Sequence, residues 1–147
     1  MTQKTKSLLN RKNPGFLLAK ALQRWNEQLY RGFCEHGYAQ VRASYGSVLV
    51  PLFEADGLRI GELARRSKLS KQTMTTMVRL LERDCLISRK ADVDDSRATR
   101  VFLTPLARRF RPIADTVLAD IEGKARRLCS RRDFDVIRKW LVDFADS

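Results

Sequence analysis

Two acids and two arginines lie close together near the middle of this strongly basic chain, in the segment Asp94-Asp95-Ser96-Arg97-Ala98-Thr99-Arg100. An arginine on an exposed turn can bind phosphate or enter a groove of a nucleic acid, but it loses up to about 2 kcal/mol of rotamer entropy when it docks. A carboxylate two residues earlier can accept the guanidinium N–H groups or hold the turn backbone. We therefore expect Asp95 to orient an inserting Arg97, Asp94 to shape the turn, and Arg100 to contact a phosphate backbone.

A second group of polar side chains recurs at steps of three and four after Ser70, on a helix whose other face carries Met74, Met77, Val78 and Leu81. A merely solvated helix more often alternates Glu and Lys. Short hydroxyl and amide groups instead suit base edges and phosphates in a major groove. The side chains expected to contact double-stranded DNA are Ser70, Lys71, Gln72, Thr73, Thr75, Thr76, Arg79, Arg89, Asp95, Arg97 and Arg100.

Within that set, individual roles differ. Ser70 and Lys71 stand at the start of the helix, where backbone N–H groups and the helix dipole favour a phosphate. Gln72 can contact a base edge, whereas Arg79 is expected to bind a phosphate.

The distribution of charge favours a polyanionic partner. The net charge is +12, and residues 1–25 carry six cations and no acids, residues 59–111 carry fourteen cations and six acids, and residues 112–147 carry seven of each. Such patches attract nucleic acid through phosphate neutralisation and counterion release. A generally basic surface is the alternative, but it does not explain the neutral C-terminal third.

Other function classes find little support in the sequence. Cys34, Cys85 and Cys129 form no CxxC pair, so neither a zinc site nor a disulfide framework is indicated. One histidine, without a nucleophile elbow or a phosphate-binding glycine loop, argues against an enzyme. We expect no metal and no cofactor. No apolar run reaches the length of a membrane span or a signal peptide, so we expect a cytoplasmic protein.

The elements that must position these residues are mainly helices. Asn13-Pro14 begins a helix that Gly37 ends, and a second runs from about Val41 to Phe53, where Pro51 should kink or shorten its end. Two helices joined by the turn Ser67–Leu69 form a helix-turn-helix over Ile60–Asp84. Two strands follow, then two helices that begin at Pro105 and after Ser130. The expected ranges are helices at 60–66, from 70 to about 84 and from 105 to about 128, with strands at 87–90 and 100–104.

This order, with the segment DDSRATRVFLT after the second helix of the helix-turn-helix, resembles the MarR family of bacterial regulators. The most specific element is Asp95-x-Arg97 followed by Val101-x-Leu103-Thr104, and Gly61–Arg89 matches the family's Glu-Leu-Ala … Leu-Glu core. The resemblance implies a mainly α fold with a small β-hairpin wing, in which terminal helices form a homodimer and each wing reaches a minor groove. Such proteins usually repress transcription and are released by a small aromatic ligand or by oxidation.

The resemblance also implies a division of the chain and two departures from the family pattern. We expect a basic arm at residues 1–13, dimerisation helices at 14–37 and 105–147, and a winged helix-turn-helix at 38–104. The family often has glycine where Ala107 stands and where Cys85 stands. If the backbone at Cys85 is left-handed, the cysteine costs about 1 kcal/mol.

Three functional hypotheses remain open at this point. The first is a homodimeric repressor of a pseudo-palindromic operator, released by an aromatic acid bound near Trp25, Arg42 and Tyr45. The alternative for these three residues is two core aromatics and a surface arginine. The second is an architectural protein that binds DNA without choosing a sequence. The third is a repressor that senses oxidation through a thiol, with Cys34, Cys85 and Cys129 all open as the sensor; family redox sensors usually carry a cysteine early in the first helix, whereas Cys34 lies near its end.

Overall fold

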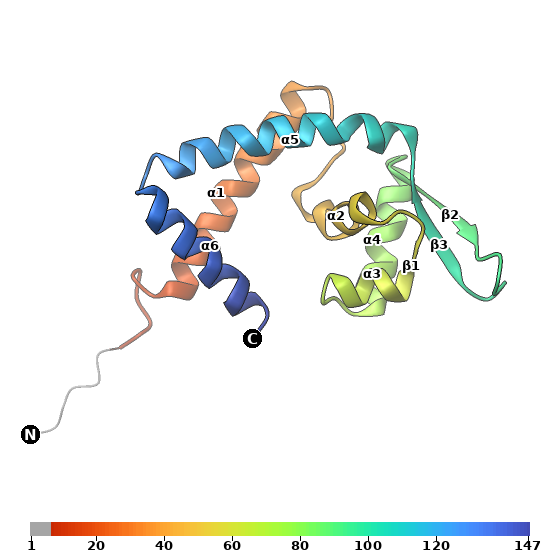
Figure 1. Ribbon diagram of the computed structural model, residues 1–147, viewed down its shortest axis with the longest axis horizontal. Helices are drawn as coiled ribbons and strands as arrows, with labels where there is room; N and C mark the ends of the chain where they lie inside the picture. Colours follow the sequence, from red (N-terminus) through yellow and green to blue (C-terminus); the bar gives the residue numbers. More distant parts are fainter. Residues whose placement is uncertain (1–6) are drawn as a thin grey trace, which may run out of the picture.

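A computed structural model describes residues 7–147, so residues 1–6 of the arm expected at 1–13 lie outside the described part. Helices dominate, and one small sheet projects from the end of the molecule that also holds α3 and α4 (Figure 1). The elements in chain order are α1 (Pro14–Glu35), the 3-10 helix η1 (Ala43–Tyr45), α2 (Gly46–Glu54), β1 (Leu58–Arg59), α3 (Ile60–Arg66), α4 (Lys71–Arg83), β2 (Ile87–Ala91), β3 (Thr99–Leu103), α5 (Pro105–Arg126) and α6 (Arg131–Ala145).

Side-chain caps begin the terminal helices where the sequence predicts. The Asn13 side chain accepts hydrogen bonds from the N–H groups of Gly15 and Phe16, at 2.9 and 3.3 Å, before Pro14 opens α1. Thr104 and Ser130 cap α5 and α6 in the same way. A cap satisfies backbone donors that have no partner inside the helix, which is why such residues fix where a helix starts.

The helix expected from Val41 to Phe53 is divided, and Pro51 does not shorten it. A 3-10 turn precedes α2, and Pro51 lies inside α2, which continues to Glu54. A proline has no N–H for the carbonyl four residues earlier, which here belongs to Ser47. The hydroxyl of Ser67 donates a hydrogen bond to that carbonyl at 2.5 Å. This bond from the helix-turn-helix replaces the missing one, so the helix passes the proline.

The helix-turn-helix lies at its predicted place, with α3 and α4 joined by a tight turn. Lys68 in this turn has φ +52°, and the N–H of Leu69 returns to the carbonyl of Ala64. Cys85, just after α4, has φ +61°. The condition stated for Cys85 is therefore met: its backbone is left-handed, and the cysteine occupies a conformation that usually favours glycine.

The sheet has three antiparallel strands in the order β1-β3-β2. The two hairpin strands match the prediction to within one residue, but β1 was missed because it is only two residues long. Leu58 pairs with Val101 and Arg59 with Arg100. This pairing attaches the hairpin, called the wing, to the segment that leads directly into α3.

The hydrophobic core lies between α1, α2, the helix-turn-helix, the sheet and α5, whose buried residues run from Ala107 to Ile121. Gly32 allows α1 to approach α5 closely, because a β-carbon there would lie 2.5 Å from Cγ1 of Val117. By contrast, α6 contains no buried residue. Large apolar side chains remain exposed on α1 and α6, namely Phe16, Leu17, Leu22, Tyr30, Val136, Ile137, Trp140, Leu141, Val142 and Phe144.

Candidate nucleic-acid interface

The exposed face of α4 is built by the amphipathic pattern of its sequence. Met74, Val78 and Leu81 are buried and Met77 is half-buried, which fixes the rotation of the helix against the core. The opposite face is therefore held outward. The residues exposed on it are Lys71, Gln72, Thr73, Thr76, Arg79 and Arg83.

Hydrogen bonds divide this face into engaged and free groups. Ser70 accepts the N–H of Thr73 at 3.0 Å and caps α4. The hydroxyls of Thr75 and Thr76 donate back to the helix carbonyls of Lys71 and Gln72, at 2.8 and 3.2 Å. These threonines are thus partly satisfied within the helix.

Arg83 on the α4 face is paired with Asp84 at 3.1 Å, but three other side chains on this face have no such partner among the described residues. Within residues 7–147, the side chains of Lys71, Gln72 and Arg79 have no hydrogen-bond or ion-pair partner. Two cations and one amide on the exposed face of a helix are donors suited to phosphate oxygens and base edges.

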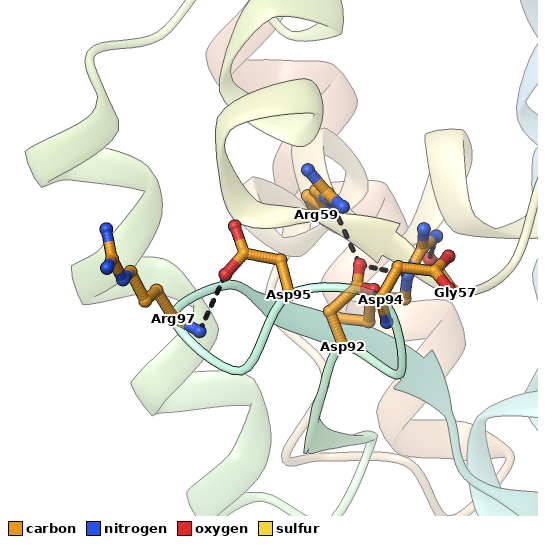
Figure 2. A network of polar contacts seen from close by, with 7 residues as sticks. Gly57, Arg59, Asp92, Asp94, Asp95 and Arg97 are labelled. Atoms are coloured by element: carbon orange, nitrogen blue, oxygen red, sulfur yellow. Dashed lines mark hydrogen bonds and ion pairs between the residues drawn. The ribbon is translucent and has the colours of Figure 1, made fainter.

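The wing tip lies beyond the ends of β2 and β3, where Arg97 is exposed. The carboxylate of Asp95 accepts the backbone N–H of Arg97 at 3.0 Å (Figure 2). Of the two mechanisms expected for Asp95, the structure contains the one in which the carboxylate holds the turn backbone. The guanidinium of Arg97 has no partner among the described residues, so its N–H groups are free to bind a partner outside the chain.

A carboxylate that the sequence analysis did not single out organises the base of the wing. One oxygen of Asp92 accepts the N–H of Asp94 at 2.8 Å, and the other accepts Nε of Arg59 at 2.9 Å and Nε of Arg100 at 2.6 Å (Figure 2). The expectation that Asp94 shapes the turn is therefore corrected: Asp94 supplies only its backbone, and Asp92 supplies the carboxylate.

The electrostatics of Asp92 follow from these bonds. Its side chain is fully buried. The hydrogen bond from the N–H of Asp94 first, and then the two arginines, hold the pKa of this carboxyl well below its usual range, against the opposing effect of burial. The lowered pKa keeps the Asp92 carboxylate charged at neutral pH.

Two arginines expected to bind DNA have partners inside the protein. Nε and Nη2 of Arg89 donate hydrogen bonds to the carboxylate of Glu82, at 2.9 and 3.0 Å. Arg100 donates to Asp92 and, at 2.9 Å, to the carbonyl of Gly57. Contacts of Arg89 and Arg100 with DNA remain predictions, and each would use the N–H groups that these bonds leave free.

A cavity of about 390 Å³ opens between α1, α2 and α5. Arg42 lies on its wall, together with Arg111 and apolar side chains that include Phe33 and Phe53. Trp25 and Tyr45 do not line it. The hypothesis that Tyr45 offers its ring to a ligand is corrected, because that side chain is fully buried in the core and its hydroxyl donates to Asp84.

The remaining features carry less chemistry. Cys34 and Cys129 are half-buried and Cys85 is exposed, all as free thiols. Residues 7–147 contain no group of three or more His, Cys, Asp or Glu side chains arranged to hold a metal ion. In the same range, none of the helices has both the length and the apolar character that a membrane crossing requires.

Comparisons with known proteins agree with this geometry. The model of the MarR family matches residues 44–99, which run from η1 to the wing, and this confirms the resemblance noted in the sequence. A search of curated protein sequences finds no match.

Three solved structures illustrate the similarity in fold. A probable transcriptional regulator from Pseudomonas aeruginosa is 25% identical, with a TM-score of 0.76 over 88% of this chain and 95% of its own. The transcriptional repressor CouR, bound to a 23-mer DNA duplex, is 23% identical, with a TM-score of 0.79 over 95% and 99%. The PcaV transcriptional regulator from Streptomyces coelicolor, in complex with its natural ligand, is 21% identical, with a TM-score of 0.76 over 92% and 94%.

Proposed function

We propose that this chain, which carries a MarR-family domain over residues 44–99, is a homodimeric transcriptional repressor that binds a pseudo-palindromic DNA duplex. The observation that carries the proposal is the free, outward-facing set of Lys71, Gln72 and Arg79 on α4, next to a wing whose tip presents Arg97. A helix enters the major groove and the wing reaches the neighbouring minor groove. Because its partner is chromosomal DNA, the proposal places the protein in the cytoplasm.

The dimer in this proposal forms through residues 14–37 and 105–147. The exposed apolar residues on α1 and α6 support it, since a monomer would leave that whole face in water. A two-fold dimer presents two copies of α4 to successive half-sites about one helical turn of DNA apart.

The effector in this proposal is a small aromatic acid in the cavity lined by Arg42 and Arg111. The size of the cavity falls within the usual range for small-molecule sites, and its mainly apolar wall also carries the carboxylates of Glu54 and Asp115 beside the two arginines. The fold shared with PcaV, whose structure contains its natural ligand, supports this hypothesis.

Selection of duplexes from random-sequence DNA, followed by titration across a salt series, tests DNA recognition. A repressor retains a specificity ratio of roughly 10³ or more at physiological salt. An architectural protein would lose nearly all preference for the selected duplex once salt weakens its phosphate contacts. We expect two chains to bind each selected duplex. A specificity ratio near one, between selected and random duplexes, would contradict the proposal.

A panel of aromatic carboxylates (benzoate, phenylacetate and cinnamate) tests the effector site. At least one should lower the affinity for the selected duplex, and Arg42→Ala should reduce that effect. Mild peroxide tests the alternative trigger: DNA affinity that falls on oxidation, and that no aromatic acid changes, would favour a thiol sensor over a ligand sensor.

A further inference from the structure

Two cations face each other across the base of the wing. Arg59 in β1 lies directly opposite Arg100 in β3. Like charges at directly opposed positions of an antiparallel pair are destabilising. The carboxylate of Asp92 removes this conflict, because a single oxygen accepts Nε of both arginines, at 2.9 and 2.6 Å.

The bonds of Asp92 reach every part of the wing base. Its other oxygen accepts the N–H of Asp94 at 2.8 Å and so closes the first turn of the wing loop. Arg100 also donates to the carbonyl of Gly57 at 2.9 Å, which lies in the turn before β1. One buried carboxylate therefore joins the wing loop, β3 and the segment that carries β1 (Figure 2).

The contacts around Asp92 also connect the wing to the helix-turn-helix. Arg59 is the N-cap residue of α3, and α3 packs against α4. The direction of the wing is thus fixed relative to α4 through Arg59 and the packing of α3. Among residues 7–147, Asp92 is the only charged residue that is buried, and such a group is costly unless it is fully paired.

We propose that Asp92 is a positioning residue, which sets the direction of the wing so that Arg97 enters the minor groove next to the site bound by α4. The inference rests on the proposed DNA-binding function and deepens it. In this proposal Arg59 and Arg100 hold the base of the wing. Asp92 contributes to the preference for a minor groove although it does not itself reach the DNA. Without Asp92, the wing base carries two facing cations and an open loop turn, and Arg97 must be ordered during binding.

The test uses Asp92→Asn in the full chain, with a duplex selected by the wild-type protein and carrying either A·T-rich or G·C-rich flanks. The amide keeps an oxygen for the N–H of Asp94 but repels the Nε–H groups of both arginines. Because ordering a side chain and loop costs binding energy, affinity for the A·T-flanked duplex should fall about three- to tenfold. Affinity for the G·C-flanked duplex should change little, because its wider groove gains less from an inserted arginine.

Asp94→Asn is the matched control, since it removes the same charge from the same loop and its side chain has no partner in the described residues. It should bind both duplexes as tightly as the wild type or more tightly, because it removes a negative charge near DNA. In an Arg97→Ala background, Asp92→Asn should have no further effect on the flank preference, which a purely structural role would not predict.

The inference is overturned if Asp92→Asn behaves like Asp94→Asn, if it weakens both duplexes equally, or if its effect persists in full without Arg97. Should Asp92→Asn not fold by circular dichroism, Arg59→Gln takes its place, because it removes one of the two Nε–H donors from the same carboxylate oxygen, and it must show the same loss of flank preference. A wild-type protein that selects no duplex would instead overturn the proposed function, and the inference with it.

Discussion

The hydroxyl of Tyr45 donates a hydrogen bond to the carboxylate of Asp84, which lies at the C-cap of α4. Burial, and then the carboxylate, raise the pKa of Tyr45, so the phenol remains protonated. Arg83 first, and then Tyr45, lower the pKa of Asp84. The bond therefore ties the end of α4 to η1, and the neighbours of Tyr45 in that segment, Arg42 and Ala43, line the cavity.

Tyr45→Phe removes this bond and little else. A hydrogen bond to a charged acceptor contributes about 1.5–3 kcal/mol, and because Asp84 keeps Arg83 we expect the free energy of unfolding to fall by about 1–2 kcal/mol. Urea denaturation measures it. Tyr38→Phe is the matched control, since the Tyr38 hydroxyl has no partner within residues 7–147. Equal stability of the two variants would show that the bond to Asp84 contributes nothing.

The features that the sequence predicts correctly depend on near neighbours in the chain. Asn13, Thr104 and Ser130 cap helices because each acts on N–H groups two or three residues away. The stripe that ends at Leu81 likewise follows from helical spacing. The residues that make such interactions lie within a few positions of one another, so a local sequence pattern is enough to predict them.

The missed features depend on partners far along the chain. Asp92 lies just before the segment DDSRATRVFLT, but Arg59, which bonds its carboxylate, lies 33 residues earlier. Tyr45 and Arg42 are close in the sequence, which suggests part of an aromatic-acid site. The hydroxyl of Tyr45, however, donates to Asp84, which lies 39 residues later in the chain. β1 is only two residues long, and it exists because β3 pairs with it. No local pattern contains these pairings.

The pH dependence of stability should show the contribution of Glu62 on α3. Arg65 first, and then Arg66, lower the pKa of Glu62 from 4.5 to about 2. A carboxyl whose folded-state pKa is lowered stabilises the protein above its unfolded pKa, and this stabilisation is lost as the pH falls through the folded pKa. Glu62→Gln should therefore melt lower than the wild type at pH 7, and the difference should shrink between about pH 4.5 and pH 2. Glu54→Gln, which removes a carboxylate without a partner in residues 7–147, should show no such convergence in calorimetry.

The apolar face of α6 should hold the dimer together. Trp140 is 46% exposed and stacks on Phe144, with ring centroids 5.0 Å apart. A stable interface buries about 800 Å² on each partner, and a charge at its centre would be desolvated without a partner. Trp140→Glu should therefore sediment as a monomer at micromolar concentration while the wild type sediments as a dimer. Arg132→Glu, on the polar side of α6, should leave the dimer intact; a wild-type monomer would contradict the assignment of this face.

Gln72 and Arg79 on α4 should affect DNA binding differently. An amide that bonds a base edge discriminates by about 1–3 kcal/mol, whereas a cation on a phosphate carries no sequence information. Gln72→Ala should alter which base is preferred at one position of the site. Arg79→Ala should weaken all duplexes alike and lower the salt dependence by about one counterion. Identical behaviour of the two variants on a panel of duplexes would contradict these roles.

The sign of the effect at Asp95 tests how the wing tip is prepared for DNA. Arg97→Ala should weaken binding by more than about 1 kcal/mol, mainly on sites with A·T-rich flanks, and should leave the unfolding midpoint unchanged. Asp95→Ala removes a negative charge close to DNA, so simple electrostatics predicts tighter binding. The carboxylate, however, holds the N–H of Arg97 at 3.0 Å, and its loss leaves that turn to be ordered during docking. We therefore expect Asp95→Ala to bind more weakly than the wild type at equal salt, while Asp94→Ala, whose side chain is free in the described residues, binds at least as tightly. Anisotropy titrations in which both variants bind more tightly would reduce Asp95 to an ordinary surface charge.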